Sequence, residues 1–126
     1  GGLVLAGGTA AEAGGRAVRQ SRARGTNLRA GRGGEGGGLG WFEADDRLPE
    51  PESLAGRALL IRHGDGTTRG WTLVRVENTP EGRARLVVRE EPGFLIDPAT
   101  RDAVYYQFPG IRVTGPHQFW VAKMTR

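Results

Sequence analysis

The chain has 126 residues, a formal net charge of +4 and no cysteine. This length fits one domain of modest size. The lack of cysteine excludes disulfide bonds, thiolate zinc sites and thiol nucleophiles. The longest apolar run is far shorter than the ~20 residues that a membrane-crossing helix needs, so we predict no membrane span.

Glycine and charge are distributed unevenly along the chain. Residues 1–40 contain 14 of the 22 glycines, six Arg and two Glu, so their net charge is 6 − 2 = +4. Residues 41–126 contain 12 Lys plus Arg and 12 Asp plus Glu, and are neutral. The basic character therefore belongs to the N-terminal segment and does not predict a basic face on the folded part.

The first 40 residues predict a leader rather than a domain. Residues 1–8 suit a short strand and residues 10–24 a poor helix, because glycine costs ~1 kcal/mol inside a helix. A strand, a glycine turn and a helix are also the order of a phosphate-binding loop, but the Gly-Lys-Ser/Thr ending is missing. Residues 25–40 offer few apolar side chains to bury, which predicts a Gly/Arg-rich linker. We therefore expect the ordered domain to span residues 41–126.

Residues 57–77 predict a β-hairpin. Residues 58–61 are an apolar run, and residues 71–77 are a second extended run. Between them, residues 64–66 are Gly-Asp-Gly, which suits a tight turn because glycine reaches positive φ and Asp bonds to its own backbone. Two extended runs joined by such a turn are typical of a hairpin.

Further short extended runs follow the hairpin. They lie at residues 84–89, 94–96, 103–108, 111–113 and 117–124, and Gly and Pro separate them. The sequence Glu91-Pro92-Gly93 is expected to end the first of these runs, since Pro cannot donate to a strand ladder. Six to seven short strands without a convincing helix predict an all-β fold, a small antiparallel β-sandwich or barrel.

No complete catalytic or metal site is visible in the sequence. His63 and His117 are the two histidines, and with Asp65 they would make a His–His–carboxylate metal site, but one His beside one Asp in a glycine loop is weak evidence for it. No Gly-x-Ser-x-Gly motif is present. We predict no catalytic residue, no metal ligand set and no cofactor in this chain.

The aromatic residues suggest a sugar-binding surface. Flat rings beside Arg and Asp can stack against sugar rings and bond to their hydroxyl groups. The candidate carbohydrate-binding residues are Trp71, Arg69, Asp65, His63 and Tyr105. The alternative is that the tryptophans are core or interface rings, because Trp is highly buried on average.

Residues 54–57 and 63–71 resemble the small C-terminal β domain of heparinase II/III-like polysaccharide lyases. Residues 91–94 and 108–119 are similar too, so the resemblance covers roughly residues 54–120. In that family the domain follows an α-helical toroid and a large β-sandwich, where the catalytic Tyr and His mainly lie. The resemblance therefore carries no catalytic residue onto this chain.

The resemblance implies an accessory β domain of a lyase that acts on uronic-acid polysaccharides. It would support the larger catalytic sandwich and touch the substrate. Its partners would be an acidic polysaccharide and the missing catalytic domain of the parent chain, in a periplasmic or secreted protein; without the resemblance a cytoplasmic location stays open.

Two alternatives remain open. A free-standing carbohydrate-binding β module predicts an exposed aromatic platform around Trp71 and Tyr105. A nucleic-acid-binding barrel with an Arg-Gly tail predicts affinity that falls steeply with salt. The neutral charge of residues 41–126 disfavours nucleic acid as a partner.

Overall fold

The computed structural model describes residues 16–17, 21–31, 35–106 and 111–125. The strand and phosphate-loop expectations for the first fifteen residues lie outside the described residues. Within the predicted helix at residues 10–24, the described positions include strand residues and no helical turn.

The described elements are almost entirely β-strands, which confirms the all-β prediction. The strands are β1 (Arg16–Ala17), β2 (Arg24–Gly25), β3 (Leu28–Ala30), β4 (Leu39–Ala44), β5 (Ala58–His63), β6 (Thr68–Asn78), β7 (Ala84–Ile96), β8 (Ala103–Tyr106), β9 (His117–Ala122) and β10 (Met124–Thr125). One turn of 3-10 helix, η1 (Pro51–Leu54), lies between β4 and β5.

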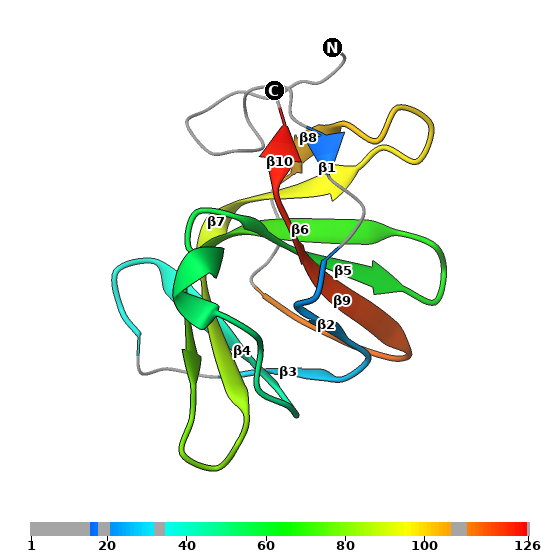
Figure 1. The fold of residues 1–126 in the computed structure, drawn as a ribbon. Coiled ribbons are helices and arrows are strands. Elements are labelled where there is room, and N and C mark those ends of the chain that lie inside the picture. The colour runs from blue at the N-terminus through cyan, green and yellow to red at the C-terminus, as the bar shows by residue number, and fades with distance from the viewer. Residues whose placement is uncertain (1–15, 18–20, 32–34, 107–110, 126) are drawn as a thin grey trace.

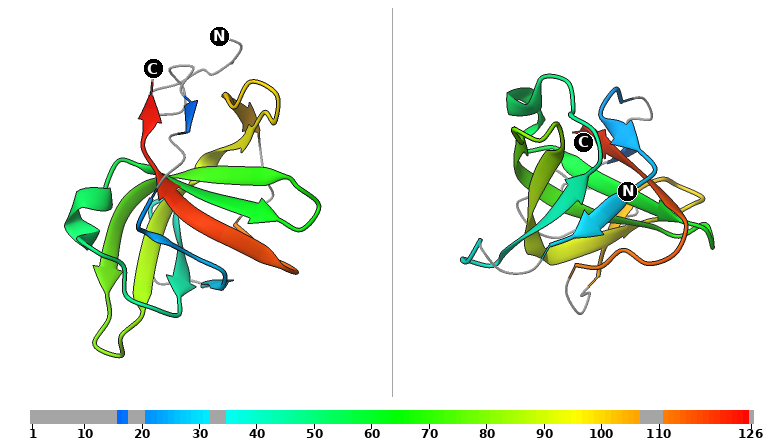
Figure 2. Two further views of the ribbon diagram at one scale, coloured as in Figure 1. Left: turned by 45° about the vertical axis from the view of Figure 1, so that its right-hand side comes forward. Right: turned by 90° about the horizontal axis from the view of Figure 1, so that it is seen from below.

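Eight of these strands form one antiparallel sheet. Its order is β2-β9-β5-β6-β7-β4-β3, and β8 pairs with β7 outside this path. The sheet curls into a half-barrel, as Figures 1 and 2 show from three directions. β1 and β10 form a separate two-stranded ladder beside the sheet. The small antiparallel fold expected from the sequence is therefore confirmed.

The β5–β6 hairpin matches the prediction, and its two strands are longer than the predicted runs. Its turn is held by Asp65, whose carboxylate accepts a hydrogen bond of 2.8 Å from the backbone N–H of Thr67. Gly66 has a φ of 91°, a conformation that glycine adopts without steric cost. Asp65 and Gly66 therefore form the tight turn that the sequence predicted.

The prediction that Glu91-Pro92-Gly93 ends a strand is wrong, because β7 continues through these residues to Ile96. The pairing explains why proline is tolerated there. On the β6 side, Gly93 pairs with Trp71 and the next pair joins Val88 to Leu73. Pro92 lies between these pairs, where the ladder is irregular and needs no donor from it.

Residues 111–113, predicted as a brief strand, are irregular in the structure. Ile111 and Val113 still contribute to the fold, because both pack against the main hydrophobic core. Their apolar pattern therefore reports burial rather than strand pairing.

Part of the predicted linker at residues 25–40 belongs to the sheet. Leu28 is buried in the core, and its backbone N–H donates a 3.0 Å hydrogen bond to Nε2 of His117. Gly25 pairs with Phe119, and a Cβ atom at Gly25 would lie 2.6 Å from a carbon of that ring. This glycine permits close packing against Phe119 rather than a flexible connection. The glycine-rich composition therefore predicted a linker where the chain forms part of the sheet.

The sheet buries apolar side chains on both faces. Inside the half-barrel lies the main core, which includes Leu59 and Ile61 of β5. The opposite face carries a smaller cluster of six buried residues, namely Ala58, Leu60, Phe94, Ala103, Ala122 and Met124. The β7–β8 hairpin supplies two of those residues, and the part of this face around β2, β9 and β5 borders a cleft.

Candidate functional site

A cleft of about 830 Å³ lies on the face of the sheet opposite the main core. We call it the arginine groove. The lining residues used below are Arg24, Arg62, Arg101, Asp97, Thr68, Gln118, Ile96 and Trp120.

Cross-strand pairing places five of these side chains on one face. Arg62 of β5 lies opposite Thr68 of β6 and Gln118 of β9. Arg24 of β2 lies opposite Trp120 of β9. Residues directly opposite each other in antiparallel strands point to the same face, so four strands contribute to a single surface.

The far wall of the groove comes from the turn between β7 and β8. The carboxylate of Asp97 accepts hydrogen bonds from the backbone N–H groups of Ala99 at 2.8 Å and Thr100 at 3.2 Å. The backbone N–H of Arg101 donates to the carbonyl of Asp97 at 2.7 Å. These bonds engage one carboxylate oxygen of Asp97 within the turn, and they fix the backbone from which Arg101 extends.

The groove is basic. Among the residues that the structure describes, no ion pair includes Arg24, Arg62 or Arg101. Asp97 is the acid in the described lining, so the local formal charge is 3 − 1 = +2. A guanidinium group is always charged in proteins, and its planar fork matches carboxylate, sulfate and phosphate oxygens.

A second set of arginines is neutralised by acids. We call it the paired-arginine face, and its members are Arg29, Arg75, Arg83, Arg85, Glu35, Glu43, Asp45 and Glu77. It lies over β3, β4, β6 and β7, where Glu43 is directly opposite both Arg29 and Arg85. Its charged groups come from strands far apart in the sequence.

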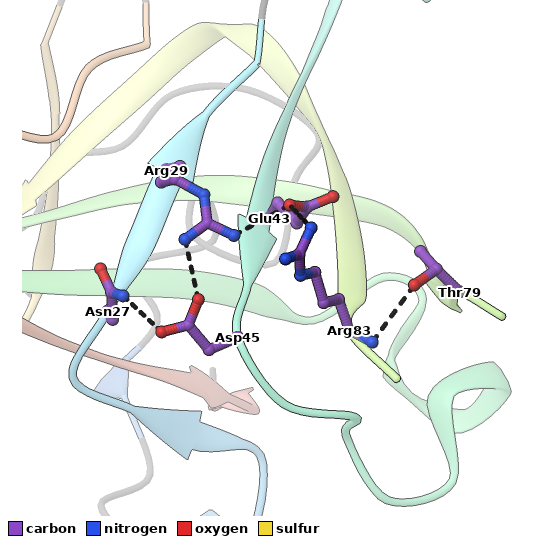
Figure 3. A network of polar contacts seen from close by, with 6 residues as sticks. All are labelled: Asn27, Arg29, Glu43, Asp45, Thr79 and Arg83. Atoms are coloured by element: carbon purple, nitrogen blue, oxygen red, sulfur yellow. Dashed lines mark hydrogen bonds and ion pairs between the residues drawn. The ribbon is translucent and has the colours of Figure 1, made fainter. Parts of the chain in front are cut away.

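Figure 3 shows one half of the paired-arginine face, where Arg29 contacts Glu43 at 2.9 Å and Asp45 at 2.8 Å. Asp45 also accepts a hydrogen bond from the side-chain amide of Asn27. The bond from Arg29, followed by that from Asn27, holds the pKa of Asp45 below its usual value.

The other half is built around Glu35, whose side chain is only 8% exposed. Its two oxygens contact Arg75 at 2.9 Å and Arg85 at 3.3 Å. The guanidinium carbon of Arg85 lies 3.9 Å from the ring centroid of Trp41, within the range of a cation–π interaction. The largely buried carboxylate thus joins the loop before β4 to β6 and β7.

Trp71, predicted as a sugar-stacking platform, lies in the core with no exposed surface. Its ring packs against Phe42, with 5.2 Å between the ring centroids and a 53° tilt. A ring without exposed surface cannot stack on a sugar, so Trp71 does not form the predicted platform. The burial follows from the register, because Trp71 lies opposite Leu59, which also faces the core.

The other hairpin candidates, Asp65, His63 and Arg69, lie in or beside the β5–β6 turn. Asp65 bonds to the backbone of Thr67, which lowers the pKa of its carboxyl group. Burial, together with the nearby charge of Arg69, lowers the pKa of the His63 imidazole. His63 follows Arg62 on β5 and therefore points to the opposite face.

Tyr105 lies on β8, opposite Phe94, and packs against the smaller apolar cluster. It is therefore separated from the hairpin candidates. None of the five predicted carbohydrate-binding residues is part of the described groove lining.

Sequence reasoning missed the residues that do line the groove. One signal was present and not used: Arg62 lies two positions after Leu60, directly after the predicted apolar run, and the alternation of a strand places two such residues on one face. The contributions of Arg24 and Trp120 depend on the pairing of β2 with β9, which joins distant parts of the chain.

No family model, curated protein or solved structure matches this chain. The described residues include no group of three or more His, Cys, Asp or Glu that could hold a metal ion. In the part of the chain described by the structure, no helix has the length and apolar character to cross a membrane.

Proposed function

We propose that this chain is a non-catalytic β domain that binds an acidic polysaccharide in the arginine groove. The observation that supports this proposal is a cleft lined by three arginines that have no ion-pair partner among the described residues. Uronic acids and sulfated sugars present the oxyanions that guanidinium groups bind in a bidentate manner.

The groove also suits the uncharged parts of a sugar. Trp120 and Ile96 are half-buried in its lining and offer apolar surface for the face of a sugar ring. Thr68 and Gln118 add donors and acceptors for hydroxyl groups. A concave site with an apolar lining and a few placed polar groups is typical of small-molecule and saccharide binding.

The resemblance to heparinase II/III-like lyases supports a more specific role within this proposal. The domain would be an accessory part of such a lyase and would hold the polysaccharide beside a separate catalytic domain. A free-standing carbohydrate-binding module would use the same groove without that partner. Comparing the affinity of this chain with that of its parent protein, if the latter is a lyase, distinguishes these roles.

The direct test is a titration of the full chain with heparin, alginate, a neutral glucan and a single-stranded oligonucleotide. Intrinsic tryptophan fluorescence reports binding, because Trp120 lines the groove. We expect saturable binding of an acidic polysaccharide and none of the glucan. Arg62→Gln should weaken binding about tenfold, the value of one charge-assisted hydrogen bond.

Arg83→Gln is the matched control, because Arg83 is an exposed arginine of the paired-arginine face. It should bind as the unmodified chain does. The proposal would be overturned by equal affinity for the neutral glucan, or by no binding of either acidic polysaccharide. Tighter binding of the oligonucleotide than of both polysaccharides would instead identify a nucleic-acid site.

A further inference from the structure

We propose that Arg101 binds the anionic group of the ligand from the wall of the arginine groove, held by the β7–β8 turn in position for a carboxylate or sulfate group. This inference rests on the proposed function and assigns the residue that determines selectivity for anionic sugars. It is based on the backbone conformation, hydrogen bonds and charge of one turn.

Arg101 has an unusual backbone conformation. Its φ is 66°, in the left-handed region that favours glycine. Among the described residues, Glu50 is the one other non-glycine residue with positive φ, at 46°. A side chain in this region is unfavourable and persists only where the surrounding structure holds it.

The turn supplies that support. The backbone N–H of Arg101 donates to Asp97 at 2.7 Å, and the N–H of Asp97 donates to the carbonyl of Asp102 at 2.8 Å. Asp102 itself is 4% exposed, which anchors the end of the turn. Glycine would satisfy this backbone geometry with less strain, so the arginine side chain has to be explained by something other than the turn.

The nearby acids do not neutralise Arg101 through a described ion pair, so its guanidinium group can bind an anion. The carboxylate of Asp97 accepts the N–H groups of Ala99 and Thr100. No ion pair in the described part of the chain includes Arg101, although it follows Asp97 by four residues and precedes Asp102. The half-buried Arg101 side chain lines the groove instead.

Such an arrangement favours tight binding of an oxyanion. A side chain on a hydrogen-bonded turn loses less conformational entropy on binding than one on a loose loop. Arg24 and Arg62 lie on strands β2 and β5, whereas Arg101 extends from the turn. A polysaccharide with an anionic group on successive sugars can therefore contact the strands and the turn together.

Arg101→Gly tests this inference in the full chain. Glycine keeps the left-handed turn, so the Tm should stay within about 4 °C of the unmodified chain. The affinity for heparin and alginate should fall about tenfold or more, because a charge-assisted contact is lost. Arg101→Lys keeps the charge but loses the planar fork, and we expect an intermediate affinity.

Two controls separate this effect from backbone strain and from net charge. Glu50→Gly replaces the other left-handed residue, which lies next to η1 and outside the groove lining. Arg89→Gln removes one exposed positive charge that is also outside the lining. Both variants should keep the affinity of the unmodified chain.

Unchanged affinity of Arg101→Gly, with weaker binding by Arg62→Gln, would overturn the role of Arg101 and leave the proposed function standing. If the unmodified chain binds neither heparin nor alginate, both proposals are overturned. Should Arg101→Gly fail to fold, Arg101→Lys decides: affinity equal to that of the unmodified chain contradicts bidentate recognition by Arg101.

Discussion

The paired-arginine face and the arginine groove use the same residue type in opposite ways. On the paired-arginine face, Arg29 contacts two carboxylates, and the largely buried Glu35 contacts two arginines. In the groove, three arginines share the described lining with Asp97 alone, and that carboxylate bonds to its own turn. The first region is neutralised by its own ion pairs, whereas the described lining of the groove carries a formal charge of 3 − 1 = +2.

This contrast shows why net charge was a poor guide to the folded part. Residues 41–126 are neutral as a whole, yet the acids that form the described ion pairs with arginines lie on the paired-arginine face and not in the described groove lining. Arg24 also lines the groove, although it lies in the leader, at the end of the predicted helix at residues 10–24. A local field depends on where charges lie in space, and a sum over the chain averages the two regions.

The largest expected difference is in binding. The double variant Arg24→Gln/Arg62→Gln should lose about 100-fold in affinity for an acidic polysaccharide, because two charge-assisted contacts disappear. The matched double variant Arg29→Gln/Arg83→Gln removes the same charge from the paired-arginine face and should keep its affinity. Isothermal titration calorimetry measures both, and equal losses would mean that total charge, rather than the groove, governs binding.

Stability, unlike binding, should depend on the paired-arginine face rather than on the groove. Glu35→Gln removes the charge that lies between Arg75 and Arg85, so two guanidinium groups remain without their carboxylate. Because both arginines are partly exposed, we expect the free energy of unfolding to fall by about 1–2 kcal/mol. Denaturant unfolding measures this change. The affinity of the groove should not change, and an unaltered free energy of unfolding would show that Glu35 is not a structural link.

The smallest expected effect is the pH dependence of the exposed network around Asp45. Its pKa is lowered in the folded chain, chiefly by the hydrogen bond from Arg29. Asp45 therefore contributes stability above its unfolded pKa of about 3.9, and that contribution is lost as pH falls through the folded pKa. Thermal unfolding from pH 6 to pH 2 should show the Tm difference between the unmodified chain and Asp45→Asn shrinking on acidification. A difference that stays constant over this range would argue against the lowered pKa.

Local patterns in the sequence predicted much of the fold. Residues 58–77 show extended runs and a Gly-Asp-Gly turn, and they form the β5–β6 hairpin. The strand alternation that put Leu60 and Arg62 on one face was also readable. These features depend on neighbours within a few residues, so the sequence contains the information needed to predict them.

Long-range pairing could not be predicted in the same way. The tolerance of Pro92 depends on an irregular ladder with β6, and the burial of Trp71 depends on its register with Leu59. The groove requires Arg24 to lie opposite Trp120, and the two residues are 120 − 24 = 96 positions apart in the sequence. These contacts decide which tryptophan borders the cleft, and neither composition nor alternation encodes them.

The most direct test of the proposed groove is a nuclear magnetic resonance titration of the full chain with an alginate oligosaccharide. We expect chemical-shift changes to concentrate at Thr68, Gln118 and the Trp120 indole, while Arg29 and Glu43 remain unperturbed. Changes centred on the paired-arginine face, or spread evenly over the exposed arginines, would contradict the assignment of the arginine groove as the binding site.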